Sequence, residues 1–573
     1  MIDFKNKISD IACKAAAAKF DGCELTCDAV LEMLEYPPDT TMGDVALPCF
    51  KLSRTLRKAP PVIANELCEA INALDVEKPF SSVTATGGYL NFKISNEYLI
   101  NNVLLAVEEK GDKYGSSDIG EGKTVVLDYS SPNTSKPFHI GHLGTTVIGH
   151  CLKLLHEFAG YKCIGINHLG DWGTQNGKQI VAFKRWGNKE EVEAKGCDGL
   201  VELYVKFHEE AEKDPSLNDE ARAEFKKMEE RDPENIALWK WFLDISLKEY
   251  NVTYDQLGIT FDYYMGESFF SDKMAAQIQV MRDKGLLKLD DGATIVDLSE
   301  YDMPPCLILK RDGASLYPSR DISAAVYRKE NFNFDKCIYV TSNGQSLHFA
   351  QWFKVVELMG YDWYDKLVHV PYGTVSIGGE KLATRTGNVI LLKDLFKQAI
   401  DKSRELIEEK NPDLADKDAT AEAIGVGAVV FHYLFNNRVK DISFILENAL
   451  SFEGSTGPYA QYTYARTCSI LEKVGDIGCG TPVITSDEEA EVLKTLNRFP
   501  EKVLEAIDEY EPSVITRYII DLCSAFNRFY HNCPIITAED EAVRETRLRL
   551  TKAVNTVLCR ALSLICMRAP KKI

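Results

Sequence analysis

Residues 130–150 read Ser-Ser-Pro-Asn-Thr-Ser-Lys-Pro-Phe-His-Ile-Gly-His-Leu-Gly-Thr-Thr-Val-Ile-Gly-His. An apolar segment at 124–129 precedes this stretch, and a helical pattern runs from about 141 to 158. Strand, tight loop and helix start form an anion site, because unpaired N–H groups and the helix dipole point at the ligand. Lys136, His139 and His142 suit a triphosphate attacked in line at its α-phosphorus, since N–H donors and a lysine meet the charge that spreads over the oxygens.

A single histidine at a helix start is usually a cap or a satisfied polar group. Here two histidines stand in an H-x-G-H pattern after a strand and a Pro-Asn loop. Gly141 between them would let a nucleotide approach the backbone closely. The context therefore predicts a nucleotide site.

The composition is that of a soluble globular protein of several domains. The chain has 573 residues, of which 45% are hydrophobic and 27% charged. It has no run of about 18 apolar residues and no signal-peptide pattern at its N-terminus, so we expect a cytoplasmic protein without a membrane partner. The 16 cysteines form no C-x-x-C pair, so we expect no metal site and no structural zinc.

The net charge of −20 is unfavourable for a nucleic-acid partner, so local charge matters more. Residues 541–573 hold eight Lys/Arg and two acidic residues, which gives 8 − 2 = +6. This basic helical face could dock RNA or could be an ordinary solvated face, and charge alone leaves both open.

The pattern along the chain predicts an α/β fold in five parts. A Rossmann-type parallel-sheet catalytic domain carries an inserted helical subdomain, with an N-terminal α+β domain before it and an all-α bundle after it. Parallel strands are expected at 124–129, 162–168, 306–309, 337–340 and 367–370. The predicted parts are 1–110, 111–184 (first catalytic half), 185–300 (charged helical insertion), 301–419 (second catalytic half) and 420–573 (helical bundle).

Several polar groups follow the expected strands, where a parallel sheet binds its ligands. Tyr317 and Asp321 are four residues apart and would share one helix face, and Gln345 follows the next strand. The loop 378–388 is bounded by glycine, and its Lys381 and Arg385 could close on a pyrophosphate leaving group.

A cluster of aromatic and polar residues opens one helix of the bundle. Such a cluster could stack on and read unpaired bases, although core packing is an equal alternative. The residues are Tyr459, Gln461, Tyr462 and Arg466.

These motifs together resemble the class I arginyl-tRNA synthetases. The resemblance covers essentially the whole chain in order. It rests on 130–142, Gly-Asp-Trp-Gly at 170–173, Tyr317 with Arg320-Asp321, the Thr-Gly-Pro-Tyr block at 456–466, Thr-Thr-Met-Gly-Asp at 40–44 and Gly-Gly-Tyr-Leu-Asn-Phe at 87–92.

The resemblance implies that the arginine carboxylate attacks the ATP α-phosphate and that the arginyl group then passes to the 3′ end of arginine tRNA. It also implies that bound tRNA is usually needed for activation, that the N-terminal domain contacts the tRNA elbow and that the bundle binds the anticodon side. We expect ATP with Mg²⁺ as substrate, L-arginine and arginine tRNA as partners, and a monomer.

Site residues follow from the same resemblance, position by position. The ATP-binding set is Lys136, His139, Gly141, His142 and Lys381. The arginine-binding set is Ser131, Asn133, His142, Tyr317, Asp321 and Gln345, with Asp128 as a further candidate for a cationic substrate group. The tRNA-binding set is Tyr459, Gln461, Tyr462 and Arg466.

One departure from the family pattern concerns the second class I motif, usually Lys-Met-Ser-Lys-Ser. Here the letters are Lys-Leu-Ala-Thr-Arg at 381–385, so Thr384 replaces the second lysine. Many arginyl enzymes share this lack and carry a lysine ahead of the histidines, as Lys136 does here. We therefore predict that the catalytic set is His139, His142, Lys136, Lys381 and Arg385, with Lys136 supplying the missing charge.

Three alternatives remain at this point. A small nucleotidylyltransferase also uses H-x-G-H, but it would need neither tRNA nor the bundle. An inactive tRNA-binding paralogue is opposed by intact Lys136, His139, His142 and Asp321. A synthetase for another amino acid is less favoured, because two acidic candidates, Asp128 and Asp321, suit a cationic substrate.

Overall fold

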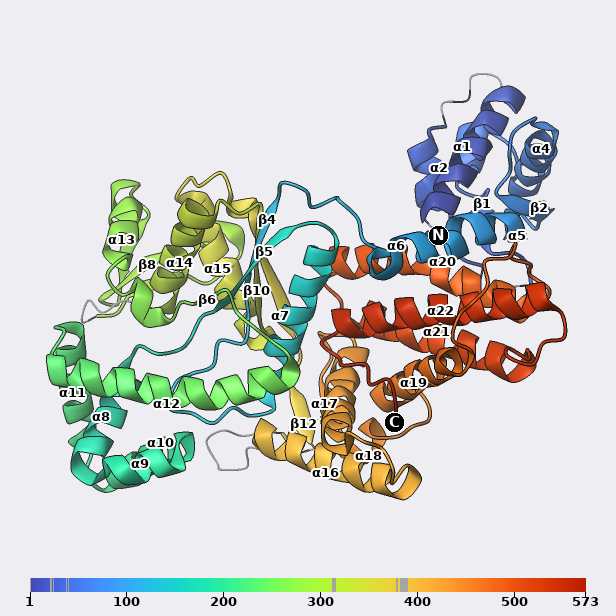
Figure 1. Ribbon diagram of the computed structural model, residues 1–573. Coiled ribbons are helices and arrows are strands. Elements are labelled where there is room, and N and C mark those ends of the chain that lie inside the picture. Colours follow the sequence, from blue (N-terminus) through green and yellow to red (C-terminus); the bar gives the residue numbers. More distant parts are fainter. Residues whose placement is uncertain are drawn as a thin grey trace.

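The computed structural model describes residues 2–20, 23, 25–37, 39, 41–311, 316–377, 380–381 and 390–573. The expected α/β architecture with a second, helical C-terminal part is confirmed (Figure 1). Thr384 and Arg385, which the sequence singled out in the second motif, lie outside the described residues.

A five-stranded parallel sheet forms the centre of the catalytic part, in the order β11-β10-β4-β5-β6. Val125, Val126 and Leu127 of β4 are all fully buried, as expected for a strand covered on both faces. The chain order reverses between β4 and β10, which is where open parallel sheets bind ligands. The strands are β4 (Thr124–Asp128), β5 (Lys162–Asn167), β6 (Tyr263–Tyr264), β10 (Lys336–Ser342) and β11 (Leu367–Tyr372).

The helix α7 (Gly141–Phe158) crosses from β4 to β5 and lies between the sheet and the C-terminal bundle (Figure 1). It is buried continuously from Leu143 to Lys153. A helix that is buried on all sides has apolar neighbours on all sides, so α7 joins the nucleotide-binding half of the molecule to the bundle. Two further helices, α14 (Tyr317–Phe332) and α15 (Ser346–Leu358), follow in the second half.

One expected strand does not join the parallel sheet. The segment Cys306–Leu309 forms β9, which pairs antiparallel with β8 in a separate three-stranded sheet, β7-β8-β9. Leu307 is 46% exposed there, so this strand has one solvated face. A short apolar run alone does not distinguish a buried parallel strand from such a hairpin strand.

The segment expected to be a helical insertion is helical only in part. It also supplies the edge strand β6 and the hairpin β7–β8. The helix α8 (Thr174–Trp186) ends where this segment begins, and the elements of the segment are α9 (Lys189–Lys195), α10 (Cys197–Lys213), α11 (Leu217–Glu229), α12 (Pro233–Leu257), α13 (Met274–Asp283), β7 (Leu287–Asp290) and β8 (Ala293–Val296).

The N-terminal part is an α+β unit whose three-stranded antiparallel sheet has the order β1-β3-β2. Gly87 and Gly88 turn the chain between β2 and β3 with positive φ, which glycine adopts without a steric cost. Its elements are α1 (Ile2–Lys19), α2 (Cys27–Met33), β1 (Val45–Pro48), α3 (Ser53–Leu56), α4 (Pro60–Ala73), β2 (Phe80–Thr86), β3 (Tyr89–Ile94), α5 (Asn96–Leu99) and α6 (Leu105–Lys110).

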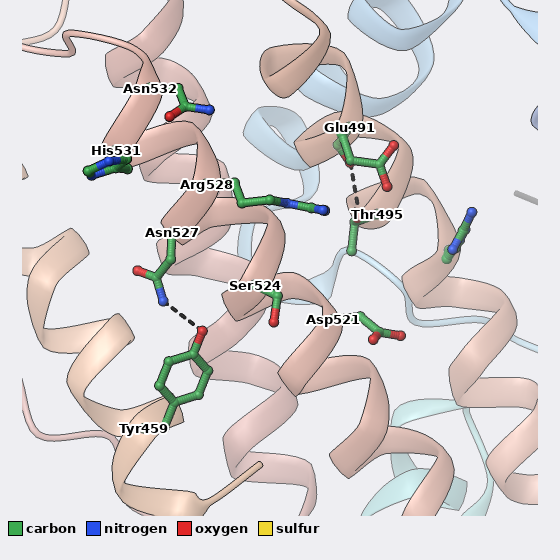
Figure 2. Close-up of a pocket in the computed structure, with 10 residues that line it drawn as sticks. Tyr459, Glu491, Thr495, Asp521, Ser524, Asn527, Arg528, His531 and Asn532 are labelled. Atoms are coloured by element: carbon green, nitrogen blue, oxygen red, sulfur yellow. Dashed lines mark hydrogen bonds between the residues drawn. The ribbon is translucent and has the colours of Figure 1, made fainter. Parts of the chain in front are cut away.

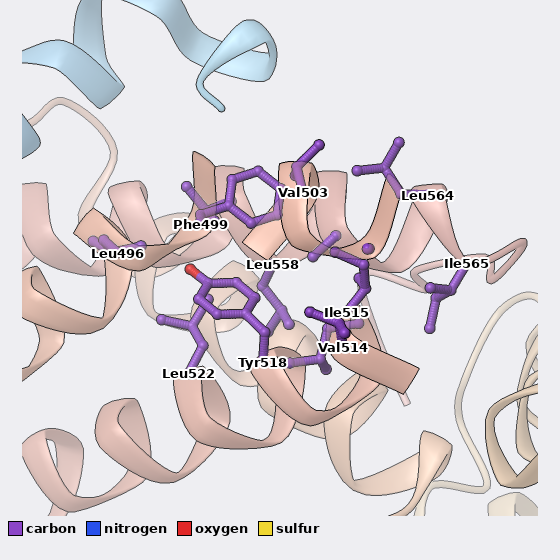
Figure 3. Close-up of a cluster of buried hydrophobic side chains, with 14 of the residues drawn as sticks. Leu496, Phe499, Val503, Val514, Ile515, Tyr518, Leu522, Leu558, Leu564 and Ile565 are labelled. Carbon is purple, nitrogen blue, oxygen red and sulfur yellow. The ribbon is translucent and has the colours of Figure 1, made fainter. Parts of the chain in front are cut away.

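The C-terminal part is a helical bundle whose apolar core is continuous with the cores of the N-terminal part and of α7. Phe499 and Tyr518 stack with ring centroids 5.2 Å apart between two of its helices (Figure 3). Its elements, with the small sheet that precedes it, are β12 (Val375–Ile377), β13 (Glu380–Lys381), α16 (Leu392–Lys410), α17 (Lys417–Phe435), β14 (Ile442–Phe444), α18 (Leu446–Ala449), α19 (Gly457–Val474), α20 (Asp487–Asp508), α21 (Ser513–Asn532) and α22 (Glu541–Leu564).

The N-terminal part docks on α20 of this bundle (Figure 1). Lys494 pairs with the buried carboxylate of Asp44 at 2.7 Å, and Lys5 pairs with Glu501 at 2.7 Å. Asp44 belongs to the Thr-Thr-Met-Gly-Asp motif, so that motif ties the two ends of the chain together.

Candidate active site and RNA-binding surfaces

The two histidines of the H-x-G-H motif share one hydrogen-bonded arrangement at the start of α7. The backbone N–H of His139 donates to Nδ1 of His142 at 3.1 Å, and the N–H of Gly141 donates to Nδ1 of His139 at 3.0 Å. Their ring centroids lie 3.9 Å apart. Because each Nδ1 accepts a hydrogen bond, each neutral ring carries its proton on Nε2 and can donate it to a phosphate oxygen.

Burial keeps both rings neutral. It lowers the pKa of His142 to about 3, with contributions from His139 and Lys136. Burial and the positive charge of Lys136 lower the pKa of His139 to about 4. The motif therefore presents two uncharged N–H donors near neutral pH.

Gly141 is required by the His139 ring itself. A Cβ at this position would lie 2.7 Å from Cε1 and 2.9 Å from Nδ1 of His139. Such distances are shorter than real Cβ contacts, so any side chain here would displace the ring. This reason is separate from the close nucleotide approach that the sequence suggested.

Lys136 has a fixed backbone and a half-buried side chain. Its carbonyl accepts hydrogen bonds from Tyr250 Oη at 2.7 Å and from Cys197 Sγ at 3.5 Å. Burial lowers the pKa of its ammonium group. Its charge contributes to the lowered pKa of both motif histidines, so the ammonium lies near them.

The segment that follows the Lys381–Arg385 loop pairs with the motif backbone. The N–H of Ile140 donates to the carbonyl of Ile390 at 3.2 Å, and the N–H of Leu392 donates to that of Phe138 at 2.9 Å. Residues 390–392 are thus held beside His139. Lys381 lies in β13, whereas Arg385 is outside the described residues.

Asp128, at the end of β4, already holds a cation from within the chain. Its Oδ2 accepts a hydrogen bond from Arg328 Nη2 at 2.7 Å, and its Oδ1 accepts one from Ser131 Oγ at 2.9 Å. Arg328 is fully buried, and Asp128 is 8% exposed. Asp128 therefore orders Ser131 and neutralises Arg328.

The loop between β4 and α7 is braced by the loop after β5. Asn133 forms a bridge with Gly170, and its carbonyl accepts from Tyr250 Oη at 2.8 Å. The Asn133 side chain approaches so closely that a Cβ on Gly170 would lie 2.1 Å from its Oδ1. This places the Gly-Asp-Trp-Gly loop beside the motif loop.

Asp321, one turn into α14, accepts a hydrogen bond from His348 Nε2 at 2.6 Å. Tyr317 begins the same helix and is 64% exposed. Gln345 is also exposed and lies just after β10. The Asp321–His348 contact thus joins α14 to the first turn of α15.

Acidic groups gather around one arginine beside these residues. Glu267 pairs with Arg320 at 3.0 Å, with both side chains largely buried. Burial raises the pKa of Glu267 to about 7, and the charges of Asp171 and Asp321 add to this, whereas Arg320 opposes it. The carboxyl groups of Glu267, Asp171 and Asp321 interact with one another, and Arg320 pairs with Glu267, so the region is suited to a further cation.

His168 lies at the centre of the same region and was absent from the sequence-based set. Burial lowers its pKa, and it interacts with the charges of Asp128, Arg328 and Asp321. It follows β5 directly, so its place at a strand end was the available signal. Glu267 follows β6, a strand of two residues whose pattern is too short to detect.

A second concave site lies in the bundle, between α19, α20 and α21 (Figure 2). Its volume is about 730 Å³. Asn527 Nδ2 donates to Tyr459 Oη at 2.9 Å at one side of it. The lining residues are Tyr459, Glu491, Thr495, Arg498, Asp521, Ser524, Asn527, Arg528, His531 and Asn532.

The four residues predicted to contact tRNA do not share one surface. Gln461 is fully buried and donates to the carbonyls of Ala423 at 2.9 Å and Arg568 at 2.8 Å. Gln461 therefore cannot contact tRNA from this position. The first turns of α19 have a buried face, and Gln461 lies on that face. Tyr462 is 43% exposed, and the Arg466 guanidinium lies 5.1 Å from its ring.

Much of the basic charge near the C-terminus is used within the molecule. Arg549 pairs with Glu108, Arg560 with Asp112 and Arg547 with Glu489. These contacts tie α22 to neighbouring elements rather than presenting a continuous basic face. They argue against an RNA-docking face formed by the basic residues of 541–573.

The described residues contain no group of three or more His, Cys, Asp or Glu side chains that could hold a metal ion. Among the described helices, none is long and apolar enough to cross a membrane.

Comparison with protein families gives three matches in chain order. Residues 4–94 match the arginyl tRNA synthetase N terminal domain. Residues 101–446 match the catalytic domain of class I (R) tRNA synthetases, and residues 460–573 match the DALR anticodon binding domain.

Curated relatives and solved structures agree with these matches. The chain is 50% identical to an arginine–tRNA ligase of Alkaliphilus metalliredigens and 47% identical to one of Halothermothrix orenii, each over 100% of both chains. The arginyl-tRNA synthetase structures of Thermus thermophilus (TM-score 0.83, 24% identity, 99% of both chains) and Plasmodium falciparum (TM-score 0.81, 23% identity, 99% and 98%) share the fold. The chain belongs to the class I arginyl-tRNA synthetases.

Proposed function

We propose that this arginine–tRNA ligase forms arginyl-adenylate at the H-x-G-H motif, with His139, His142 and Lys136 acting on the α-phosphate. A carboxylate oxygen of arginine bonds to the α-phosphorus, the bond to the bridging oxygen breaks, and its electron pair leaves with pyrophosphate. The two Nε2–H donors and the ammonium group stabilise the charge on the phosphate oxygens in the transition state.

In the second step, a hydroxyl oxygen of the tRNA 3′-terminal ribose attacks the carbonyl carbon of the adenylate. AMP leaves with the electron pair of the broken bond, and the hydroxyl proton is released. Lys381 and Arg385 remain in the proposed catalytic set as cations of the loop that precedes residues 390–392, which are held beside His139.

The guanidinium group of the substrate would bind beside Asp321, with Tyr317 at the start of the same helix and Gln345 after β10. A guanidinium is a planar fork of donors that suits carboxylate acceptors. The acidic surroundings of Glu267 support a cation in this region. Ser131, Asn133 and His142 would contact the α-carboxylate and α-amino end, and we assign Asp128 to holding Arg328 instead.

The remaining assignments concern partners and compartments. The parts 1–110 and 420–573 would contact tRNA, with Tyr459, Tyr462 and Arg466 on the anticodon side, while 111–184, 185–300 and 301–419 form the catalytic region. The enzyme would act as a cytoplasmic monomer. Mg²⁺ would arrive on the ATP phosphates, which usually supply its ligands, and we assign no residue to it.

The two Nδ1 contacts of the motif are the observation that carries the catalytic assignment. The test is ATP–pyrophosphate exchange with arginine and arginine tRNA, measured for Lys136→Ala and for Lys136→Arg. Loss of this charge should lower kcat about a hundredfold, and the arginine variant should recover part of it. If Lys136→Ala kept the wild-type exchange rate while Thr384→Ala lost activity, the assignment of Lys136 would be wrong. The stabilisation of the α-phosphate would then have to come from the second motif.

A further inference from the structure

One hydrogen bond joins the two helices of the second catalytic half that lie at the proposed arginine site. Nε2 of His348, in the first turn of α15, lies 2.6 Å from Oδ2 of Asp321, one turn into α14. A carboxylate oxygen only accepts hydrogen bonds, so Nε2 of this histidine carries the proton and donates it. Among the described residues, no other side-chain hydrogen bond or ion pair joins α14 to α15, although the two helices are neighbours (Figure 1).

This hydrogen bond connects the elements that carry three of the proposed arginine contacts. Tyr317 and Asp321 are one turn apart at the start of α14, and Gln345 immediately precedes α15, three residues before His348. Side chains of a binding site must be held within about 0.5 Å of their productive positions. A contact that fixes α14 relative to the start of α15 therefore also fixes Tyr317 and Asp321 relative to Gln345.

The first turn of α15 is itself held on the parallel sheet. Phe349, the residue after His348, is buried, and its ring stacks on that of His369 in β11 with centroids 4.4 Å apart and planes 3° apart. Nε2 of His369 lies 2.8 Å from Oγ1 of Thr341 in β10. The ring of His348 meets that of Phe349 edge-on, with centroids 5.5 Å apart. His348 therefore reaches Asp321 from a turn whose place is set by two strands of the sheet.

The same contact leaves one oxygen of Asp321 for a ligand. Oδ2 is occupied by His348, whereas no hydrogen-bond donor among the described residues reaches Oδ1. The side chains of Asp321 and His348 are 27% and 28% exposed, so the pair lies open to a substrate. The terminal torsion of an aspartate rotates easily. The imidazole restrains that rotation, and the N–H donors of a guanidinium can then bind Oδ1.

We propose that His348 is a positioning residue for arginine recognition, which holds the carboxylate of Asp321 in the orientation that accepts the substrate guanidinium. This inference rests on the proposed function, in which Asp321 binds that group. His348 does not touch arginine, and its effect on the substrate passes through Asp321. Loss of the imidazole lets the carboxylate rotate and weakens arginine binding, whereas the groups at the α-phosphate stay in place.

The test is aminoacylation of arginine tRNA by the full-length enzyme, with arginine and ATP varied in turn. His348→Ala should raise KM for arginine about tenfold, as expected for loss of a hydrogen bond to a charged group. Both kcat and KM for ATP should stay within about threefold, because the groups at the α-phosphate are unchanged. His348→Gln should recover most of the arginine affinity, since its side-chain N–H donor can reach the same oxygen.

Gln351→Ala is the matched control. Gln351 lies on the same helix, three residues after His348, and its Nε2 donates to the carbonyls of Pro304 at 2.8 Å and Pro305 at 3.2 Å. This variant also removes side-chain hydrogen bonds that anchor α15, but none of them reaches α14. It should leave KM for arginine unchanged. A tenfold rise in this variant as well would make His348 a general anchor of α15 and would overturn the proposal.

Asp321→Ala, alone and combined with His348→Ala, separates this inference from the proposed function. Asp321→Ala should raise KM for arginine about a hundredfold, and the double variant should be no worse, because no carboxylate is left to position. A raised KM in Asp321→Ala with a wild-type KM in His348→Ala would overturn the inference and leave the proposed function intact. Additive effects would also overturn it, since His348 would then act independently of Asp321. A wild-type KM in Asp321→Ala would overturn the proposed guanidinium site, and the inference with it.

Discussion

Arg328 on α14 reaches Asp128 at the end of β4 and donates to its Oδ2 at 2.7 Å, although 200 positions separate them. The pair is buried and lies between the first and second halves of the parallel sheet. The sequence offered two carboxylates, Asp128 and Asp321, as candidates to bind the guanidinium group of the substrate arginine. One of them, Asp128, already binds the guanidinium group of Arg328. This relationship separates the structural carboxylate, Asp128, from the proposed substrate carboxylate, Asp321.

Asp128→Asn should therefore act mainly on stability. Removal of one partner leaves Arg328 buried and unpaired, which should lower the free energy of unfolding by about 3–5 kcal/mol. Urea unfolding at pH 7 measures this. The double variant Asp128→Asn with Arg328→Met should recover much of the loss, because no lone charge remains buried. An unchanged unfolding midpoint with a raised KM for arginine would instead make Asp128 a substrate ligand.

The sequence predicted the nucleotide site well because its parts are local. The strand, the loop and the whole of α7 occupy residues 124–158, and their patterns reflect burial and capping over that span.

Other features depend on contacts that a sequence pattern does not contain. No sequence pattern near Asp128 indicates that Arg328, 200 positions away, will pair with it. β6 is two residues long, so Glu267 could not be placed at a strand end. β9 has the composition of a buried parallel strand, and only its pairing with β8 shows otherwise.

Gly141→Ala should reduce catalysis without unfolding the protein. The new Cβ would occupy the space of the His139 ring, which would move and lose the hydrogen bond from residue 141. We expect kcat of ATP–pyrophosphate exchange to fall about a hundredfold, as for loss of one transition-state donor, with an unchanged circular dichroism spectrum. In a His139→Ala variant, the further substitution Gly141→Ala should lower kcat of ATP–pyrophosphate exchange only slightly more. A full additional loss there would show that the glycine acts through something other than this ring.

Gln461 and Tyr462 are neighbours in sequence and should behave in opposite ways. Gln461→Ala removes two hydrogen bonds inside the bundle and should lower the free energy of unfolding by about 2–3 kcal/mol. Tyr462→Ala removes an exposed ring, so stability should change by less than about 0.5 kcal/mol. If the ring stacks on a tRNA base, KM for tRNA should rise about tenfold. Equal tRNA affinity in Tyr462→Ala and the wild type would place the anticodon elsewhere.

Buried histidines should make the protein less stable in mild acid. His156 is 1% exposed, and its Nδ1 lies 2.7 Å from the Leu152 carbonyl, to which it donates. Burial lowers its pKa to about 4, whereas a histidine in the unfolded chain has a pKa of about 6.5. Between these values the unfolded state binds more protons, so stability is complete above about pH 6.5 and falls as the pH drops toward 4.

Unfolding free energies measured at pH 7, 6 and 5 test this effect against His156→Asn, which keeps a donor for the Leu152 carbonyl. The wild-type free energy should fall with a slope that is larger by up to about 1.4 kcal/mol per pH unit. Subtraction of the two curves removes the contribution of carboxylates, which titrate in both proteins. Parallel curves would mean that His156 binds protons equally in the folded and unfolded states, and its burial would then have no part in the acid sensitivity.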